Sequence, residues 1–266
     1  MQVGISTASL FMRRNNEDAL SLLNELGIPV AEVFLTSFSE YGAPFCDLLR
    51  ARKGNLHINS VHVLNSQIEP QLFSAHERVK QDSYELLDKV LTSANALNAP
   101  YYTFHGTARY KKASRDPRND NFQKMGESIR EISDFCKARG VTLCLENVEW
   151  STYNRVGVFS KMKEYAPDLR GVLDVKQARI AGEGYAPYIE EMGKDLAYAH
   201  ISDVTEKGKM CLPGQGVFDF ETFLKRLQDV GFDGALLIEV YKENFETERQ
   251  LKIACDYVQE LVYKLS

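Results

Sequence analysis

Short apolar runs rich in branched residues recur along this chain, with helical stretches between them. Such runs predict eight strands, at Val3–Ser6, Val30–Leu35, Ile58–Leu64, Tyr101–His105, Thr142–Glu146, Gly171–Asp174, Ala197–Ser202 and Ala235–Val240. Seven repeats between residues 3 and 235 give a mean spacing of about 33 residues, the size of one strand–helix unit. Strict alternation of strand and helix favours a parallel sheet.

The length of the chain turns this alternation into a specific fold. A (β/α)₈ TIM barrel takes roughly 250 residues, and the chain has 266. No linker rich in Pro, Ser or Gly and no low-complexity stretch divides it. We therefore expect an α/β protein, a (β/α)₈ TIM barrel, with one domain spanning residues 1–266.

Several residues are typical of helix ends. Asn16, followed by Glu17 and Asp18, is expected to cap a helix. Ser74 and Glu77 have the spacing of a capping box, which would open a helix reaching about Leu97. Asp219 is expected to cap a helix that ends before Gly231.

Composition and charge exclude several function classes. The net charge of −5 and the pI of about 5.7 predict neither a nucleic-acid partner nor a polybasic membrane anchor. No apolar run has membrane-spanning length. The five cysteines form no CxxC pair and no signal peptide is visible, so we expect reduced thiols in a cytoplasmic protein.

Ionisable residues stand at the ends of six consecutive predicted strands, which are otherwise apolar. These residues are His62, His105, Glu146, Asp174, His200 and Glu239. Because the carboxyl ends of the strands of a barrel meet at one mouth, all six side chains are expected to face one cavity. A lone histidine at a strand end is more often a packing residue; both interpretations stay open for His62, whereas function is favoured for His105.

The three carboxylates need a counter-charge. At 4 Å and an effective dielectric constant near 20, each pair of carboxylates repels by about 4 kcal/mol. No Lys or Arg lies within these strand ends. A bound cation is the simplest explanation, and three oxygens with one imidazole suit Mn²⁺, Mg²⁺, Co²⁺ or Zn²⁺. We predict one divalent ion held by Glu146, Asp174, His200 and Glu239.

Two loops carry weaker signals. The polar segment Arg109–Asn121, which includes Lys111, Lys112, Arg115 and Arg118, follows the fourth predicted strand. It is either a solvated surface loop or a lid that contacts a substrate phosphate. The stretch Leu212–Gly216 could hold a phosphate, although a plain turn is favoured.

The order of these motifs resembles the xylose isomerase-like TIM-barrel superfamily, which includes sugar-phosphate isomerases and epimerases and endonuclease IV-type enzymes. The resemblance spans nearly the whole chain. Its motifs are His62, Phe-His105-Gly, Leu-Glu146-Asn, Leu-Asp174-x-x-Gln177, Ala-His200-Ile-x-Asp203, Pro-Gly-x-Gly216 and Ile-Glu239. It implies that Glu146 and Glu239 bind the metal and also act as acid and base. The metal would bind a substrate carbonyl and the neighbouring hydroxyl and stabilise an enediolate.

The chain departs from this pattern at one place. Many relatives carry Asp-x-x-His on the sixth strand, where this chain has Asp174-Val-Lys-Gln177. Gln177, or Lys176 beside it, would replace that histidine in contacting substrate. No histidine follows His200, which argues against three-metal endonuclease chemistry.

Other residues at the predicted mouth are assigned to substrate or to a second ion. We expect His62, His105, Lys176, Gln177 and Asp203 to bind substrate. A second metal near His62 and His105, bridged by Glu146, is an alternative use of the two histidines.

The leading hypothesis is a metal-dependent sugar or sugar-phosphate isomerase or epimerase that uses two-carboxylate proton transfer. The alternatives are a dehydratase of a polyol or keto sugar, an endonuclease IV-like phosphodiesterase and a catalytically silent sugar-binding protein. The expected partner is a small sugar or sugar phosphate. The sequence leaves open whether the chain forms a homo-oligomer.

Overall fold

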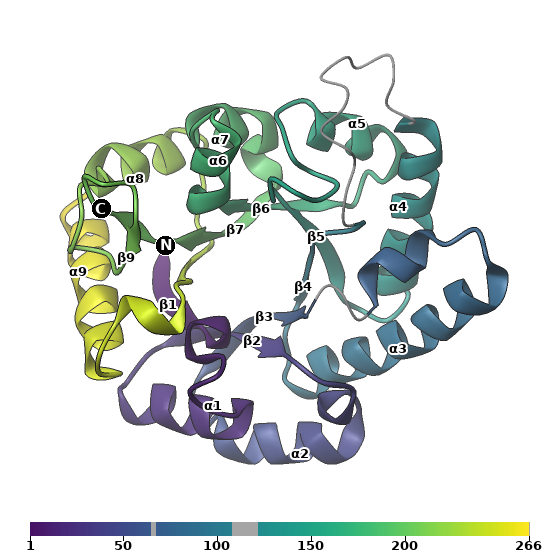
Figure 1. The fold of residues 1–266 in the computed structure, drawn as a ribbon, viewed down its shortest axis with the longest axis horizontal. Helices are drawn as coiled ribbons and strands as arrows, with labels where there is room; N and C mark the ends of the chain where they lie inside the picture. Colours follow the sequence, from purple (N-terminus) through teal and green to yellow (C-terminus); the bar gives the residue numbers. More distant parts are fainter. Residues whose placement is uncertain (65–67, 108–121, 266) are drawn as a thin grey trace.

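Eight parallel strands close into a barrel in the computed structural model, which describes residues 1–64, 68–107 and 122–265. The barrel strands are β1 (Gln2–Ser6), β2 (Val30–Leu35), β3 (His57–Val63), β4 (Tyr101–Phe104), β5 (Thr142–Glu146), β6 (Arg170–Asp174), β7 (Leu196–Ile201) and β10 (Ala235–Ile238). Each pairs with its neighbours in chain order, and β10 closes the ring against β1 (Figure 1). The predicted single-domain TIM barrel is confirmed.

Helices surround the strands (Figure 1). They are α1 (Asn16–Glu25), α2 (Ala43–Arg52), α3 (Glu77–Ala96), α4 (Phe122–Lys137), α5 (Val158–Tyr165), α6 (Val175–Ala181), α7 (Ala186–Met192), α8 (Phe220–Asp229) and α9 (Arg249–Leu265). Short 3₁₀ turns, η1 (Thr7–Leu10), η2 (Phe38–Glu40), η4 (Glu69–Phe73), η6 (Gly193–Asp195) and η7 (Lys242–Asn244), stand between them. A small hairpin of β8 (Asp203–Val204) and β9 (Met210–Cys211) follows β7.

All eight predicted strands are present, with ends that differ by at most two residues. The largest difference is in the last strand, which was expected to reach Val240 and ends at Ile238. The Glu239 N–H still donates to the carbonyl of Ile201, but the Val240 N–H donates to Ser9 Oγ instead of a neighbouring strand. The chain therefore leaves the sheet directly after it has delivered Glu239 to the mouth.

Two of the three predicted helix caps are wrong. Asn15, rather than Asn16, precedes the first turn of α1, and the Asn16 side chain is buried, donating to the carbonyl of Phe34. The Ser74 side chain accepts from the N–H of His76 and forms no capping box, so α3 begins at Glu77. The cap by Asp219 is confirmed, because its carboxylate accepts from the N–H of Thr222.

The interior of the barrel is layered. Val30, Cys144, Val172, Tyr198 and Leu237 belong to a small apolar cluster that is separate from the main core between strands and helices. A polar layer lies beside it, since Tyr198 OH and Thr103 Oγ1 are 2.6 Å apart and Thr103 Oγ1 donates to Glu32. The side chains of the apolar cluster fill the interior of the barrel. A ligand would therefore enter from the mouth.

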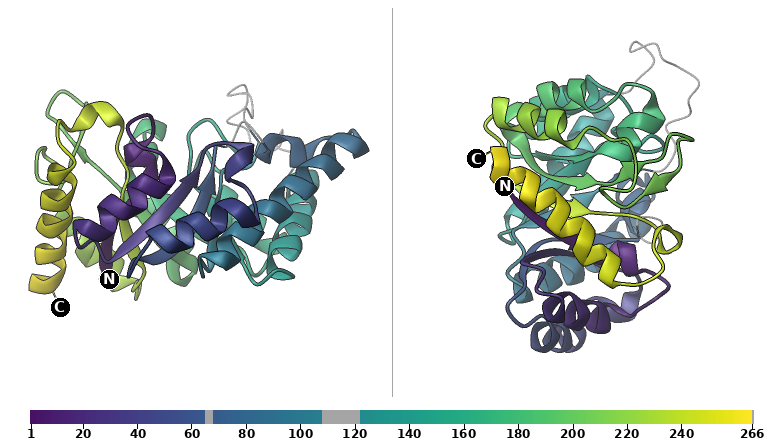
Figure 2. Two further views of the ribbon diagram at one scale, coloured as in Figure 1. Left: turned by 90° about the horizontal axis from the view of Figure 1, so that it is seen from below. Right: turned by 90° about the vertical axis from the view of Figure 1, so that its left-hand side faces the viewer.

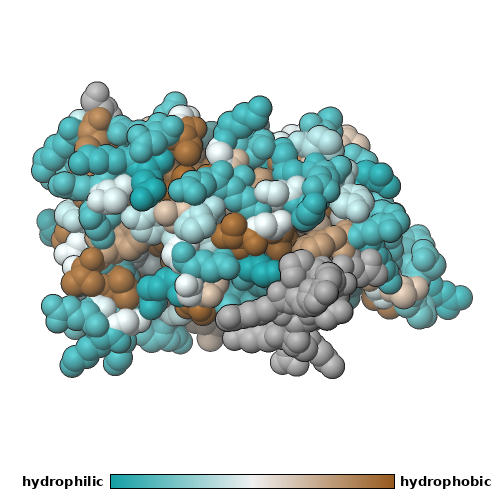
Figure 3. Space-filling view, turned by 90° about the horizontal axis from the view of Figure 1, so that it is seen from above, coloured by the Kyte–Doolittle hydropathy of each residue, from teal (hydrophilic) through white to brown (hydrophobic). Residues whose placement is uncertain are grey.

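The chain ends and the surface fit this arrangement. Both termini lie at the end of the barrel where the strands begin, opposite the mouth (Figure 2). The side of the molecule uppermost in Figure 1 is mainly hydrophilic, with small, separated apolar patches (Figure 3). Among the described residues, no helix combines the length and the apolar character needed to cross a membrane.

Candidate metal centre

The four predicted ligands gather around one imidazole nitrogen at the mouth. Glu146 and Asp174 are the last residues of β5 and β6, His200 lies near the end of β7, and Glu239 follows β10. His200 Nδ1 is 3.0 Å from Glu146 Oε1 and 3.4 Å from Glu239 Oε2. Ligand atoms of Glu146, Asp174 and His200 all lie within 4.8 Å of one another. This spacing suits a single ion.

A second carboxylate fixes the direction of the His200 ring. Its Nε2 atom lies 3.0 Å from Glu32 Oε1, on the side away from Glu146. Glu32 is completely buried in β2, where the hydroxyls of Ser6 and Ser60 donate to it. Histidines that bind metals through one nitrogen commonly hold a carboxylate with the other. The pair therefore presents Nδ1 to the cluster.

Buried polar atoms without a well-formed hydrogen bond are concentrated here. Among the described residues, six buried side-chain atoms have no well-formed hydrogen bond, and five of them belong to this cluster. They are His62 Nδ1, His105 Nδ1, Glu146 Oε2, His200 Nε2 and Glu239 Oε2. Two of them still face an ion-pair partner, because Glu146 Oε2 lies 2.9 Å from His105 Nε2 and His200 Nε2 lies 3.0 Å from Glu32 Oε1. Such atoms are rare in folded proteins, because each costs roughly 1–3 kcal/mol. The donor set and these atoms fit a divalent cation.

The charges within the cluster lead to the same conclusion. Burial acts to raise the pKa of Glu146, but the charge of His200 and the hydrogen bond from His105 outweigh it, and the pKa lies well below its usual value. Burial opposes protonation of His200, yet the charges of Glu32, Glu239 and Glu146 raise its pKa well above the ordinary value. A proton on His200 thus balances the carboxylates around it, and a metal bound at this position would displace that proton.

Lys176 supplies a positive charge that was not expected near the strand-end carboxylates. A cation does reach the strand ends, since Lys176 Nζ lies 3.5 Å from Asp174 Oδ2 and 5.0 Å from the centre of the Tyr241 ring. Burial opposes its charge, but the charges of Asp174 and Glu239 outweigh burial and raise the pKa of Lys176 above its usual value. Lys176 stands in the first turn of α6, outside the strand ends in which no Lys or Arg was found.

His62 and His105 lie on the other side of Glu146. Their Nε2 atoms are 3.1 Å apart, and His105 Nε2 is 2.9 Å from Glu146 Oε2. The three residues offer ligand atoms within 4.8 Å of one another, so they form a second candidate group for a cation. Burial opposes protonation of His105, but its hydrogen bonds to Glu146 and Glu69 raise its pKa to about 10.

Two buried carboxylates that were not predicted from the sequence lie beneath the predicted ligands. A signal for Glu32 exists, because it is the only charged residue in the apolar strand Val30–Leu35. Glu69 has no such signal, since it lies in the 3₁₀ turn η4. Its carboxylate accepts from Tyr102 OH and from the N–H groups of His105 and Gly106. It therefore fixes the segment that carries His105.

Gln177 lies beside Asp174. Its N–H donates to Asp174 Oδ1, and its side-chain oxygen accepts from the N–H of Glu149 at 3.4 Å. The side chain is half-buried, so it borders the cluster at the position where many relatives carry a histidine.

Asp203, which was expected to bind substrate, forms hydrogen bonds to the backbone of a loop. Its carboxylate accepts from four backbone N–H groups, those of Val204, Gly214, Gly216 and Phe218. The Asp203 carboxylate therefore stabilises the loop after β9. The N–H groups of Gly214 and Gly216 serve this turn, which agrees with the favoured interpretation of Leu212–Gly216.

Three further sequence features are not part of the centre. The segment Arg109–Asn121 lies outside the described residues. His57 is the exposed first residue of β3, at the end of the barrel opposite the mouth, and His76 is exposed before α3.

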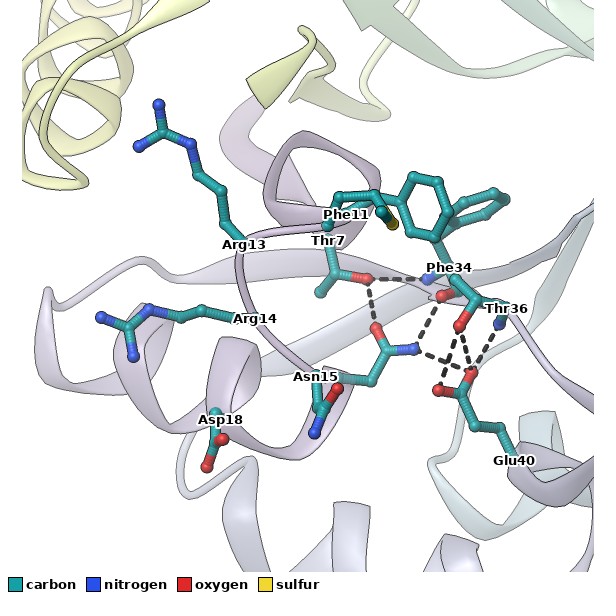
Figure 4. Close-up of a pocket in the computed structure, with 11 residues that line it drawn as sticks. Thr7, Phe11, Arg13, Arg14, Asn15, Asp18, Phe34, Thr36 and Glu40 are labelled. Carbon is teal, nitrogen blue, oxygen red and sulfur yellow. Dashed lines mark hydrogen bonds between the residues drawn. The ribbon is translucent and has the colours of Figure 1, made fainter. Parts of the chain in front are cut away.

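A cavity of about 470 Å³ lies next to the mouth, among residues that follow β1 and β2. Phe34 forms part of its wall and also packs against His62, with ring centres 4.9 Å apart. Figure 4 shows Thr36 and Glu40 on one side of the cavity and the Phe11 and Phe34 rings on another. Arg13 and Arg14 extend away from them, and Arg14 pairs with Glu248.

Comparison with known proteins identifies the family. The model of the xylose isomerase-like TIM barrel family matches residues 20–261. L-ribulose-5-phosphate 3-epimerase UlaE of Shigella flexneri serotype 5b (strain 8401) is 22% identical over 228 residues, which cover 76% of this chain and 75% of that protein.

Solved structures show the same fold. D-psicose 3-epimerase from Clostridium cellulolyticum H10, solved with D-tagatose, has a TM-score of 0.76 and 16% identity, covering 98% of this chain and 97% of that chain. IOLI protein, solved with a bound zinc atom, has a TM-score of 0.79 and 16% identity, covering 99% of both chains.

Proposed function

The chain belongs to the xylose isomerase-like TIM barrel family, and we propose that it is a metal-dependent epimerase or isomerase of a sugar or sugar phosphate. One observation carries the proposal: the carboxylates of Glu146 and Glu239 both flank His200 Nδ1, at 3.0 and 3.4 Å. Two carboxylates beside one metal-binding nitrogen can hold an ion and act on a substrate bound to it.

Four residues would hold the ion: Glu146, Asp174, His200 through Nδ1, and Glu239. Three oxygens and one nitrogen suit Mn²⁺, Mg²⁺, Co²⁺ or Zn²⁺. When bound, the ion would polarise the carbonyl and the adjacent hydroxyl of a keto sugar. A C–H bond next to that carbonyl becomes acidic enough for a carboxylate to remove its proton.

Glu146 and Glu239 would carry out the proton transfers. One carboxylate takes the proton from carbon, and the bonding electrons move into the carbonyl group to give an enediolate. The other carboxylate returns a proton to the opposite face of the same carbon, which inverts the stereocentre. Return to the neighbouring carbon would give aldose–ketose isomerisation instead.

The remaining residues of the mouth would bind the sugar. His62, His105, Lys176 and Gln177 border the cluster, and the cavity beside Phe34 offers room for the far end of the substrate. The names of the relatives suggest the first substrates to test, which are L-ribulose 5-phosphate, D-psicose and D-tagatose. His62, His105 and Glu146 would hold a second ion, if two are bound.

The test combines metal analysis with an assay. Protein purified without chelator should contain about one divalent ion per chain, or two if the second group is used, as measured by elemental analysis. Each of the three sugars is then incubated with protein in D₂O, and NMR follows new isomers and deuterium at carbon. A metal-loaded protein that leaves all three sugars unchanged would contradict these substrates, and a protein that binds no ion would contradict the function.

A further inference from the structure

Three carboxylates surround the proposed ion, and their charges do not balance. Glu146, Asp174 and Glu239 contribute three negative charges, whereas a divalent ion contributes two positive ones. The deeper carboxylate of Glu32 is stabilised separately, by the hydroxyls of Ser6, Ser60 and Thr103. Counted on the three carboxylate ligands and the ion alone, one negative charge is left in excess, and a cation beside the ligands would reduce it.

Lys176 is a cation placed to supply this positive charge. Its side chain is only 8% exposed, and its ammonium lies 3.5 Å from Asp174 Oδ2. The other contact that the structure gives the ammonium within the described residues is the face of the Tyr241 ring at 5.0 Å. A buried ammonium with one carboxylate at such a distance retains hydrogen-bonding capacity towards the mouth.

Burial of the Lys176 ammonium is unfavourable unless negative charges nearby stabilise it. Lysine is almost never buried without a partner, and moving an ammonium out of water costs several kcal/mol. Asp174 alone cannot serve both as a metal ligand and as a full counter-ion for Lys176. Attraction by the carboxylates of the centre, with Asp174 at 3.5 Å, explains why the ammonium stays there.

We propose that Lys176 is a built-in counter-cation of the metal centre, which reduces the negative charge of the loaded site and weakens its hold on the divalent ion. This inference rests on the proposed function of the same site. Proton removal from a keto sugar moves an electron pair onto the carbonyl oxygen, and an excess of negative charge around the ion would oppose that step. The ammonium of Lys176 reduces this excess, so the developing negative charge is stabilised.

The first arm of the test measures Mn²⁺ binding alone. Chelator-treated protein is titrated with Mn²⁺ at constant ionic strength, and free Mn²⁺ is measured by electron paramagnetic resonance. Lys176→Met, which keeps the volume and removes the charge, should bind Mn²⁺ at least tenfold more tightly than wild type. Lys176→Gln is a second neutral variant, and Lys176→Arg should bind within about threefold of wild type.

Arg179→Met is the matched control, because Arg179 is an exposed cation on the same short helix. Its Mn²⁺ affinity should stay unchanged. The direction of the change in Mn²⁺ affinity distinguishes loss of the Lys176 charge from distortion of the site. Loss of the charge should tighten Mn²⁺ binding, whereas a distorted site would bind Mn²⁺ less tightly. If both neutral variants bind Mn²⁺ no more tightly than wild type, the proposal is overturned.

The second arm measures turnover at saturating Mn²⁺, with L-ribulose 5-phosphate and D-psicose. Lys176→Met should lower kcat about 100-fold with little change in KM, and Lys176→Arg should restore most of the loss. Unchanged kcat in Lys176→Met would overturn the catalytic part. If wild type converts neither sugar, the proposed substrates fail, while the Mn²⁺ arm still decides the role of Lys176.

Discussion

Glu32 and His200 stand on the second and seventh strands of the barrel, yet their Oε1 and Nε2 atoms lie 3.0 Å apart beneath the mouth. Both side chains are fully buried. This pair leaves His200 Nδ1 facing Glu146 and Glu239, so a fully buried residue beneath the mouth would determine which imidazole nitrogen meets the proposed ion.

Replacement of this carboxylate should weaken metal binding. Glu32→Gln keeps the shape but removes the charge that orients the His200 ring and makes Nδ1 more basic. Substitution of such a partner typically costs 10–100-fold in metal affinity, and we expect a loss in this range for Mn²⁺. Titration with Mn²⁺ checks it, with Glu25→Gln on the exposed face of α1 as the control. Equal affinity in the Glu32 and Glu25 variants would disprove the orienting role.

Removal of the metal should lower the thermal stability of the protein. An ion that binds only the folded state stabilises it by about 2.7 kcal/mol when present at 100 times its dissociation constant. Chelator should therefore lower the Tm by several degrees, and added Mn²⁺ should restore it. A variant with Glu146→Gln and Asp174→Asn should show little response to either addition. A Tm that ignores chelator in wild type would argue that no ion is bound.

The convergence of the strand-end residues could be predicted because the carboxyl ends of the strands of a barrel meet at one rim. Parallel strands of similar length place their carboxyl ends on one rim, so Glu146, Asp174, His200 and Glu239 needed only correct strand ends to be brought together. Register is sensitive to single residues, and the pattern of apolar runs located these ends within two residues.

Residues outside the strands could not be placed in this way. Lys176 depends on how α6 begins, and Glu69 on the path of a 3₁₀ turn, neither of which has a periodic signal. For Asp203 the position was predicted from the sequence, but the contacts of its carboxylate were not. It stands next to strand β7 in the family motif, but its carboxylate is used by four backbone N–H groups that the sequence does not reveal.

Loss of the Asp203 carboxylate should destabilise the fold. Asp203→Ala leaves four N–H groups in the 203–218 loop without their acceptor, at a cost of about 2–4 kcal/mol in the free energy of unfolding. Asp203→Asn keeps one oxygen and should lose less. Urea unfolding measures both, and Asp219→Ala, which removes a helix cap, gives a reference loss of about 1 kcal/mol. A smaller loss in Asp203→Ala than in Asp219→Ala would contradict this role.

Separate replacement of Glu146 and Glu239 should reveal the division of the proton transfers. Glutamine keeps the shape and one oxygen ligand but cannot accept a proton from carbon. General-base catalysis contributes about 10²–10⁴-fold, so each variant should lose at least 100-fold in kcat while it still binds sugar. Trp150 can report that binding, because it is the only tryptophan and its ring centre lies 5.6 Å from that of His105.

The two variants should differ in how they fail. If each carboxylate serves one face of the substrate, the variant that retains the proton-removing carboxylate should exchange the substrate proton in D₂O without inverting the carbon. The other variant should do neither, since its remaining carboxylate faces the wrong side of the C–H bond. NMR distinguishes deuterium incorporation from formation of the epimer. If both variants keep their metal and turn over at near wild-type rates, neither carboxylate transfers the proton, and the epimerase assignment must be abandoned with the mechanism.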